Sequence, residues 1–380
     1  MATIIFKPTE KCNSNCIYCD VVVKKQPKTM SFELLEHIFK NIDAYLKAKP
    51  QERIQLVWHG GEPLLLGEEY FLKAAEMQEK YCPETKFRLQ HAIQSNLTLM
   101  NQNFLDIFRR MGIDQIGTSF EPIANMRGPG AKRDSVTYNR QFMNGINLLE
   151  KNNFGWGFIY VVTKKALERP LDVFFYLSNL KLSGSFMLNP VLVYGEDTEN
   201  IGITSDEYAD FLGAIFPHWW NHRDRYPIVN PFKMYTENLV ENKHTTGCED
   251  TGQCAYGHVY IGPSGEASQC GRAGDWEIIS YGNINERSLI DIMADEQREQ
   301  FIKRNDVLLA GECKDCPYWE FCHGGCPLDS FIQNKSFMHR TNRCEGKKLF
   351  LEKYFFPITG VRIEDKHGKN NEKNNGKNNC

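Results

Sequence analysis

Residues 12–19 read Cys-Asn-Ser-Asn-Cys-Ile-Tyr-Cys and follow a short apolar run at Thr3–Phe6. This stretch places three cysteines in eight residues, with the spacing C-x3-C-x2-C. Three thiolates on one tight loop can hold a metal centre and leave one position open, whereas structural zinc sites usually close with four ligands. No fourth Cys or His follows in the loop, because Asp20 and three valines come next. The loop therefore favours a metal centre with an open position for chemistry.

The overall composition excludes several classes of protein. The 380 residues can form one large domain or two smaller ones. The 45 basic and 48 acidic residues nearly balance, so we expect no nucleic-acid partner. No apolar run reaches the roughly 18 residues of a membrane span, and the first residues lack the basic start of a secretory signal. We therefore expect a cytoplasmic protein that does not bind a membrane.

The cytoplasmic prediction decides how the thirteen cysteines are interpreted. In a reducing compartment, closely spaced cysteines bind metals or act in catalysis more often than they form disulfides. Disulfides remain the alternative. Cys82 and Cys380 stand apart from the clusters, and we assign them no function.

Residues 1–204 alternate strand-like and helix-like segments. Helical periodicity is clear at Leu34–Leu46, where Ser31 is placed as the cap, and at Phe104–Met111, where Gly112 is a stop signal. Alternating units of this kind form a parallel sheet with helices outside, and ligands bind at the carboxyl ends of its strands. Six units predict an α/β fold, a partial (β/α)6 barrel of the TIM type. The apolar runs that predict its strands are Thr3–Phe6, Ile54–Trp58, Phe87–Ile93, Gln115–Phe120, Gly157–Val162 and Ser185–Leu188.

The composition changes after the predicted barrel. Residues 205–245 are rich in aromatic side chains and predict a helical bridge. Residues 246–355 hold eight cysteines and many Gly and Pro, interrupted by a helix near Leu289–Lys303; such a region needs metal to fold. Residues 356–380 predict a disordered polar tail.

The eight later cysteines have the spacing C-x5-C-x15-C, then C-x2-C-x5-C-x3-C, then a last Cys after seventeen further residues. They are enough for two four-coordinate sites, and spacing alone leaves a pair of zinc ribbons open. These cysteines are Cys248, Cys254, Cys270, Cys313, Cys316, Cys322, Cys326 and Cys344.

The first cysteine loop, on the end of the first strand of a partial barrel, resembles that of the radical S-adenosylmethionine (SAM) superfamily. The resemblance implies that Cys12, Cys16 and Cys19 bind a [4Fe–4S] cluster whose fourth iron is chelated by SAM. Tyr18 would then lie against the adenine. The implied chemistry is one-electron cleavage of SAM to a 5′-deoxyadenosyl radical, which takes a hydrogen atom from the substrate.

Polar residues at later strand ends resemble the SAM site of that family. The second strand is followed by Gly-Gly-Glu-Pro, where the glycines allow close approach of a ligand and the carboxylate can accept from an ammonium group. An arginine would pair with the SAM carboxylate, and the sequence leaves Arg127, Arg133 and Arg140 open. The other implied SAM contacts are Gly60, Gly61, Glu62, Pro63, Ser95, Asn96 and Ser119.

The later cysteines resemble the SPASM extension of radical SAM enzymes, including anaerobic sulfatase-maturating enzymes. By this resemblance, one auxiliary [4Fe–4S] cluster is bound by Cys248, Cys254, Cys270 and Cys326. The second is bound by Cys313, Cys316, Cys322 and Cys344. With the SAM-binding cluster, the resemblance implies three clusters in all.

SPASM proteins mostly act on peptides, so the resemblance implies a peptide maturase. Our main hypothesis is an intramolecular crosslink, a carbon–carbon bond or a thioether, in a ribosomally made precursor peptide. The alternative is oxidation of Cys or Ser to formylglycine in a sulfatase. Sulfatase maturases typically carry an Asp directly after the third auxiliary cysteine, where this chain has Gly271. This departure favours the crosslinking hypothesis. Asp275 is the candidate base, but a shift of four residues does not carry the role over, because a base must lie within hydrogen-bonding distance of its proton.

Two further expectations concern partners and turnover. An electron donor such as flavodoxin or ferredoxin is expected beside the precursor peptide. The sequence also starts directly at the first strand, so recognition of the peptide would fall to the barrel mouth, the bridge or a separate protein. A hypothesis outside the enzyme class is an iron–sulfur scaffold or redox sensor that binds SAM without turnover. The intact SAM motifs argue against it.

Overall fold

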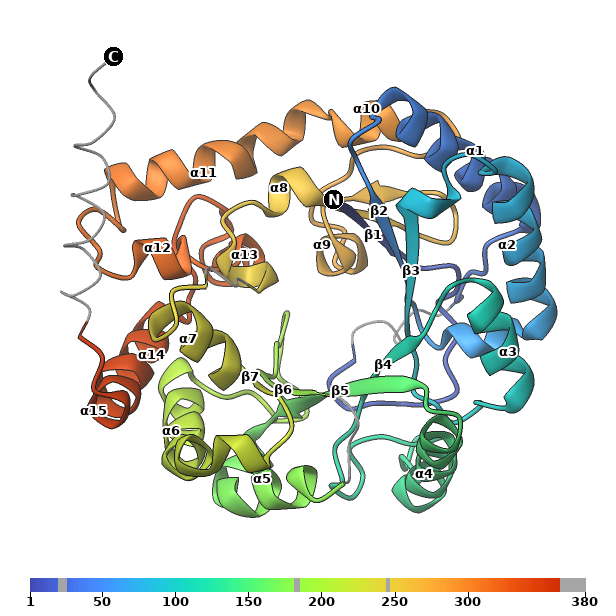
Figure 1. Cartoon of the computed structure of the whole chain (residues 1–380). Coiled ribbons are helices and arrows are strands. Elements are labelled where there is room, and N and C mark those ends of the chain that lie inside the picture. Colours follow the sequence, from blue (N-terminus) through green and yellow to red (C-terminus); the bar gives the residue numbers. More distant parts are fainter. Residues whose placement is uncertain (20–25, 181–184, 244–246, 363–380) are drawn as a thin grey trace. The chain divides into compact units, whose positions relative to one another are not determined.

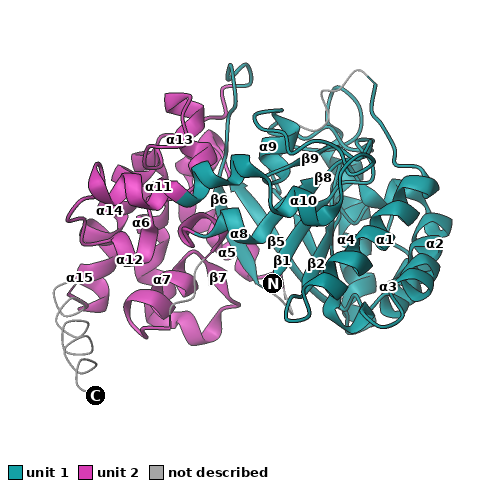
Figure 2. Ribbon diagram, turned by 90° about the horizontal axis from the view of Figure 1, so that it is seen from above, with its two compact units in different colours: residues 1–161, 182–199, 253–302 teal, residues 162–181, 200–252, 303–380 magenta. Residues whose placement is uncertain are grey.

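A computed structural model describes residues 1–19, 26–180, 185–243 and 247–362. The chain divides into two compact units, which we treat separately (Figure 2). The first comprises residues 1–161, 182–199 and 253–302, and the second comprises residues 162–181, 200–252 and 303–380. This division does not test the predicted domain boundaries at residues 204, 245 and 355, which stay predictions. Asp20 lies outside the described residues.

The first unit is built on a mixed sheet with the strand order β6-β5-β4-β3-β2-β1-β8-β9 (Figure 1). Neighbouring strands from β1 to β5 are parallel, as expected for successive β/α units. The predicted α/β fold with a parallel sheet is therefore confirmed. The strands are β1 Ala2–Phe6, β2 Ile54–Trp58, β3 Leu89–Gln94, β4 Gln115–Ser119, β5 Gly155–Val162, β6 Phe186–Pro190, β8 His258–Ile261 and β9 Ala267–Ser268.

The register of the sheet brings three strand ends to one level. Phe6 pairs with Trp58, and Trp58 pairs with Ile93. Because the strands are parallel, the segments that follow them leave the sheet at the same edge. The cysteine loop, the Gly-Gly-Glu-Pro turn and the Ser95–Asn96 pair all begin at this edge.

Two strands of the cysteine-rich segment join this sheet, which the sequence did not predict. β8 pairs in parallel with β1, from Thr3 opposite His258 to Phe6 opposite Ile261. β9 then pairs antiparallel with β8. The segment that carries Cys254 and Cys270 is therefore anchored to the same strand as the first cysteine loop.

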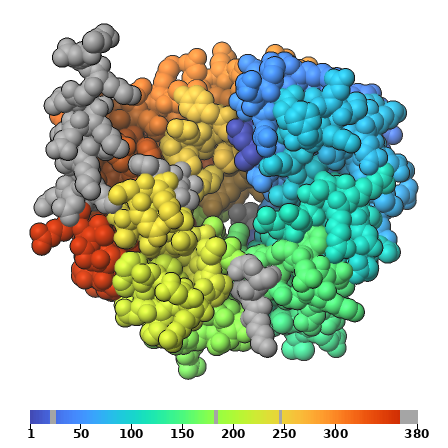
Figure 3. Space-filling model, in the orientation of Figure 1, coloured from blue at the N-terminus to red at the C-terminus, as the bar shows by residue number. Residues whose placement is uncertain are grey.

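Helices α1 to α4 cover the outer side of the first unit, and their side chains form a closed surface from blue to green (Figure 3). The predicted caps are confirmed: Ser31 Oγ accepts from Leu34 N at the start of α1, and Gly112 follows α3 with a φ of +76°. The apolar stripe of α1, from Leu34 to Leu46, is buried as its period predicts. These helices are α1 Phe32–Ala48, α2 Glu68–Tyr81, α3 Gln102–Arg110 and α4 Ser135–Lys151.

The second unit is mainly helical and has an aromatic core. The predicted bridge contains α6 Ser205–His222 and α7 Phe232–Leu239, and it also includes the short strand β7 Val229–Asn230. The Phe216 ring lies against Trp219, Phe232, Phe350 and Phe355, with ring centroids 5.1–5.9 Å apart. Its other helices are α5 Pro170–Ser178, α12 Trp319–Cys322, α13 Pro327–Asn334, α14 Cys344–Phe350 and α15 Phe356–Thr359.

Two local predictions are corrected. The single helix expected near Leu289–Lys303 is two helices, α10 Leu289–Met293 and α11 Glu299–Ala310, because the side chains of Ser288 and Asp295 each cap a new turn. The predicted tail begins with α15, so its first residues are ordered; residues 363–380 lie outside the description. Short helices α8 Cys254–Gly257 and α9 Gly271–Asp275 complete the cysteine-rich segment of the first unit. No described helix has the length and hydropathy of a membrane span.

Candidate active site

The three cysteines of the first loop face one cavity of about 560 Å³. The loop is fixed by backbone hydrogen bonds from Asn15 N to Gly128 O (2.8 Å) and from Ile17 N to Met126 O (2.9 Å). Burial raises the pKa of the Cys12 thiol to about 12. Metal binding must therefore displace the thiol proton, as it does at other thiolate sites. The cavity is lined by Cys12, Asn13, Ser14, Asn15, Cys16, Ile17, Cys19, Gly130, Arg133, Thr198 and Glu199.

The structure shows why residues 60 and 61 are glycines, which the sequence did not reveal. A Cβ on Gly60 would lie 2.2 Å from the carbonyl oxygen of Thr9, and one on Gly61 would lie 2.2 Å from that of Lys11. Gly61 N also donates to Thr9 O (2.9 Å). The two glycines therefore let the turn after β2 pack against the chain's own backbone, directly before Cys12.

Glu62 connects two strand ends. Its fully buried carboxylate accepts from Ser95 Oγ (2.8 Å), Asn96 N (2.7 Å) and Leu64 N (2.9 Å). Burial nevertheless raises its pKa to about 7, against the lowering effect of these donors. The structure thus brings together the Gly-Gly-Glu-Pro turn and the Ser95–Asn96 pair, while Pro63 begins the 3-10 turn that follows.

Asn13 extends this network to the cysteine loop, and the sequence analysis missed it. Asn96 Nδ2 donates to Asn13 Oδ1 (2.8 Å), and Asn13 Nδ2 donates to Thr98 Oγ1 (2.9 Å). The only available signal was its position between the first two cysteines.

Arg127 and Glu121 form a buried ion pair behind the loop. The guanidinium lies 2.7 Å from Glu121 Oε2 and also donates to the hydroxyls of Tyr18 and Tyr138 and to Ser119 O. The Tyr18 hydroxyl donates in turn to Glu121 (2.9 Å). Tyr18 and Ser119 are therefore hydrogen-bonded to this pair. Most of the N–H donors of Arg127 bond to groups of the protein itself. The sequence analysis assigned no role to Glu121.

The three candidate arginines differ in position. Arg140 lies on the exposed face of α4. Arg133 lines the cysteine cavity, where Nε donates to Asn15 O (3.1 Å) and the guanidinium pairs with Glu199 (2.5 Å). Among these three arginines, all of which the structure describes, Arg133 alone lines the cavity.

Asp275 lies at the end of α9 and pairs with Lys7, the residue after β1. Lys7 is 1% exposed and Asp275 is 16% exposed. A Cβ on Gly271 would lie 3.3 Å from Ile5, which shares a side of β1 with Lys7. Residues 271 and 275 are one helical turn apart, so both face the same side of β1.

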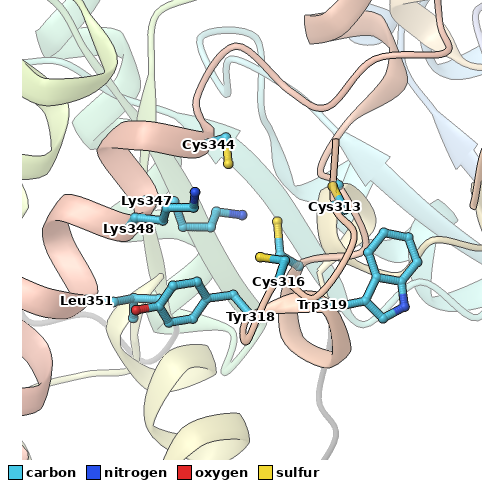
Figure 4. A pocket seen from close by; sticks show the side chains of 10 residues that line it. Cys313, Cys316, Tyr318, Trp319, Cys344, Lys347, Lys348 and Leu351 are labelled. Carbon is cyan, nitrogen blue, oxygen red and sulfur yellow. The ribbon is translucent and has the colours of Figure 1, made fainter. Parts of the chain in front are cut away.

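Four later cysteines line a second cavity, within the second unit. Cys313, Cys316, Cys322 and Cys344 surround it together with Lys347 and Lys348 (Figure 4). This is the set predicted for the second auxiliary cluster. The thiols border a cavity instead of converging on one point, and no group of three or more described His, Cys, Asp or Glu residues is arranged to hold a single metal ion. Four cysteine thiolates are the usual ligand set of a [4Fe–4S] cluster, so the residues at this cavity fit the predicted cluster.

The set predicted for the first auxiliary cluster is divided between the units. Cys254 and Cys270 belong to the first unit, where Gln269 Nε2 donates to Cys254 O (2.8 Å). Cys248 and Cys326 belong to the second unit. The grouping of these four cysteines stays a prediction.

Two regions of the chain match known protein families. Residues 6–177 match the family model of the Radical SAM superfamily, and residues 248–317 match that of the SPASM iron-sulfur cluster-binding domain. The chain is a radical SAM protein with a C-terminal SPASM domain. Its predicted cofactors, SAM and [4Fe–4S] clusters, are those that these two families imply.

Individual proteins and solved structures are also similar to this chain. A serine-type anaerobic sulfatase-maturating enzyme of Bacteroides thetaiotaomicron is 25% identical over 84% of this chain and 81% of its own length. The structure of native anSMEcpe with bound AdoMet and the Cp18Cys peptide has a TM-score of 0.78 at 21% identity, covering 94% of this chain and 98% of that one. Streptococcus suis SuiB bound to precursor peptide SuiA has a TM-score of 0.60 at 15% identity, covering 90% and 76%. The sequence relatives thus favour the alternative hypothesis over peptide crosslinking.

Proposed function

We propose that this protein oxidises a Cys or Ser side chain of a peptide or protein substrate to formylglycine, as an anaerobic sulfatase maturase. The observation that carries the proposal is similarity to a sulfatase-maturating enzyme over 84% of the chain. This reverses the order of the two hypotheses drawn from sequence. An external one-electron donor of the flavodoxin or ferredoxin type belongs to the proposal.

Three groups of residues would hold the cofactors. Cys12, Cys16 and Cys19 would bind the cluster that cleaves SAM to the 5′-deoxyadenosyl radical. Arg133 would pair with the SAM carboxylate, because its guanidinium already lines the cavity and its partner Glu199 is exposed and replaceable. The Glu62 carboxylate, buried at the next strand end, would accept from the SAM amino group. The eight later cysteines would bind the two auxiliary clusters.

Asp275 would act as the base despite its displacement from the usual position. Gly271 and Asp275 face the same side of β1, so the carboxylate projects from the same face of α9 as a side chain at position 271 would. Lys7 pairs with it and holds it in place. The substrate carbon would lose a hydrogen atom to the 5′-deoxyadenosyl radical, its OH or SH a proton to Asp275, and one electron would pass to an auxiliary cluster. Serine then gives the aldehyde, and cysteine gives a thioaldehyde that water converts to the aldehyde with release of hydrogen sulfide.

Peptide crosslinking remains the second candidate, because of Gly271. Sulfatase maturases typically carry an Asp at this position, and this departure from their pattern supports the second candidate.

The proposal is tested with the anaerobically reconstituted protein, SAM, a reductant and peptides that carry Cys or Ser in a sulfatase sequence. Formylglycine is an aldehyde, so the product should react with a hydroxylamine or hydrazide probe. Oxidation of serine to formylglycine and formation of a crosslink both remove two hydrogens from the peptide, so mass alone does not separate them for a serine peptide. A crosslinked peptide has no aldehyde and does not react with the probe. A probe-silent product, or SAM cleavage without any peptide change, would contradict the proposal.

Asp275→Asn tests the base. General base catalysis contributes about 100-fold or more, so product formation should fall by that factor. SAM cleavage should persist, because the cysteine loop is unchanged. Asp106→Asn, at an exposed site on α3, is the matched control and should keep full activity. Full product formation by Asp275→Asn would remove this residue from the mechanism.

A further inference from the structure

Lysine ammonium groups and thiols share the cavity of the second unit. Lys347 and Lys348 come from α14, which begins at Cys344, and their side chains extend toward the region between Cys344 and Cys316 (Figure 4). Lys347 is 10% exposed and Lys348 is 30% exposed, so neither is an ordinary solvated surface lysine. Two buried or half-buried cations beside four thiols require an electrostatic explanation.

A third cation contacts one of the thiols directly. Arg340 Nη1 donates to Cys344 Sγ at 3.4 Å. Its position is fixed by Glu345, 3.0 Å from Nη2. Hydrogen bonds to the ligand sulfurs are one of the factors that set the potential of an iron–sulfur cluster.

Two acidic groups oppose these cations. Asp250 is 1% exposed and pairs with Lys347 at 2.5 Å, and the exposed Glu345 lies 3.6 Å from Lys348. Lys347 and Lys348 thus line the cavity, and Arg340 contacts the thiol of Cys344. Asp250 is the buried counter-ion of Lys347.

We propose that Arg340, Lys347 and Lys348 raise the reduction potential of the auxiliary cluster that Cys313, Cys316, Cys322 and Cys344 would hold. Four thiolates outweigh the positive charge of the iron–sulfur core, so the liganded cluster is an anion. Reduction adds a further negative charge. Cations at the rim stabilise the reduced state more than the oxidised state, and low local polarity strengthens the effect.

A higher potential bears on the proposed function. The four cysteines would hold a cluster that can accept one electron, such as the electron that the substrate radical would lose when the aldehyde or the crosslink forms. An oxidised one-electron carrier protein would then take up that electron. The inference rests on iron–sulfur occupancy of the cavity, which iron content tests separately from the identity of the product.

The test is a potentiometric titration of the reconstituted full-length protein, followed by electron paramagnetic resonance. Lys348→Met should lower the midpoint potential of one cluster and leave the other transitions in place. Lys353→Met is the matched control: it removes the same charge from the next turn of chain, where the side chain is 54% exposed and pairs with Asp210 outside the cavity. Lys348→Arg should retain the wild-type potential.

A second variant should shift the reduction potential in the opposite direction. Asp250→Asn removes the buried negative charge and should raise the potential of the same cluster, opposite to Lys348→Met. Both proteins must carry wild-type iron, which shows that the cluster is present. Unchanged potentials in both variants, shifts in the same direction, or an equal shift in Lys353→Met would overturn the inference. Product formation plays no part in this readout, so a failed proposal on the substrate leaves it intact.

Discussion

Gly61 is a residue on which the geometry of the first cysteine loop depends. The position where its Cβ would lie is 2.2 Å from Lys11 O, 2.5 Å from Lys11 C and 2.7 Å from Glu10 O. All three are backbone atoms that lead directly into Cys12, so none can move aside without moving the cysteine.

Gly61→Ala should therefore displace the loop. Overpacking of this kind costs about 1–3 kcal/mol in free energy of unfolding. We also expect less iron at the first cluster and weaker SAM binding, measured by iron analysis and equilibrium dialysis. Gly67→Ala is the control, because nothing lies within 4 Å of its Cβ, although its φ of +82° adds local strain. Equal loss of iron in the two variants would contradict the role assigned to Gly61.

Residue types and spacing were enough to predict much of the site at this scale. Glu62, Ser95 and Asn96 were expected near SAM, and the structure joins them by hydrogen bonds. Their contacts with SAM stay predictions. Spacing could not choose among the arginines, because the direction of each depends on the loop after β4 and on the buried Glu121.

At the scale of elements, Arg304 of α11 holds the loop between Cys322 and Cys326. Its guanidinium is 3% exposed and donates to the carbonyls of His323, Gly324, Gly325, Phe337 and His339. Gly324 and Gly325 both have positive φ, and an added Cβ would meet Leu308 at 2.3 Å or Thr341 at 2.4 Å. The loop that spaces two cluster ligands is therefore set by one arginine and two glycines.

Arg304→Gln should destabilise this loop strongly. Each buried carbonyl left without a donor costs about 1–3 kcal/mol, so we expect a lower melting temperature and loss of auxiliary iron. The radical SAM cluster should remain, because its ligands lie in the first unit. Lys303→Gln, at the exposed neighbouring position of α11, should behave as wild type. If Arg304→Gln kept the wild-type content of auxiliary iron, Arg304 would not be needed to hold the loop between Cys322 and Cys326.

Helix periods and caps predicted the elements of the first unit well. The ends of α1 and α3 agree with their cap signals, because caps act locally. The break between α10 and α11 was missed because Asp295 was not recognised as a cap inside an apolar period. β8 was missed because its partner strand β1 lies far away in sequence, and the two-residue strand β9 is defined by its pairing with β8.

At the scale of the whole molecule, the first cysteine loop and the later cysteines should be separable. Changing Cys12, Cys16 and Cys19 together to Ala should abolish formation of 5′-deoxyadenosine. About twelve irons per chain are expected for three [4Fe–4S] clusters, and this variant should lose about a third of them. Iron analysis and electron paramagnetic resonance of the purified variant provide the measurement.

The contrasting variant is Cys326→Ala, which should reduce auxiliary iron and destabilise the later region while leaving SAM cleavage detectable. Metal ligation is coupled to folding in cysteine-rich segments, so we expect a lower melting temperature as well. SAM cleavage retained by the triple variant would refute the assignment of the first loop, and unchanged iron in Cys326→Ala would count against its role as a ligand.

The amino-acid sequence determined the class of the protein, because thiolate spacing and strand–helix alternation are local patterns that one chain displays without folding. It also determined which cysteines are available as cluster ligands. Only the tertiary structure decided that Gly60 and Gly61 pack on the cysteine loop and that the Arg127 guanidinium bonds to Glu121 and Tyr18. It also decided that Gly271 lies against Ile5 and that Asp275 pairs with Lys7. It also placed Lys347 and Lys348 at the four-thiol cavity. These contacts join residues distant in sequence, and their geometry follows from packing, which no local pattern encodes.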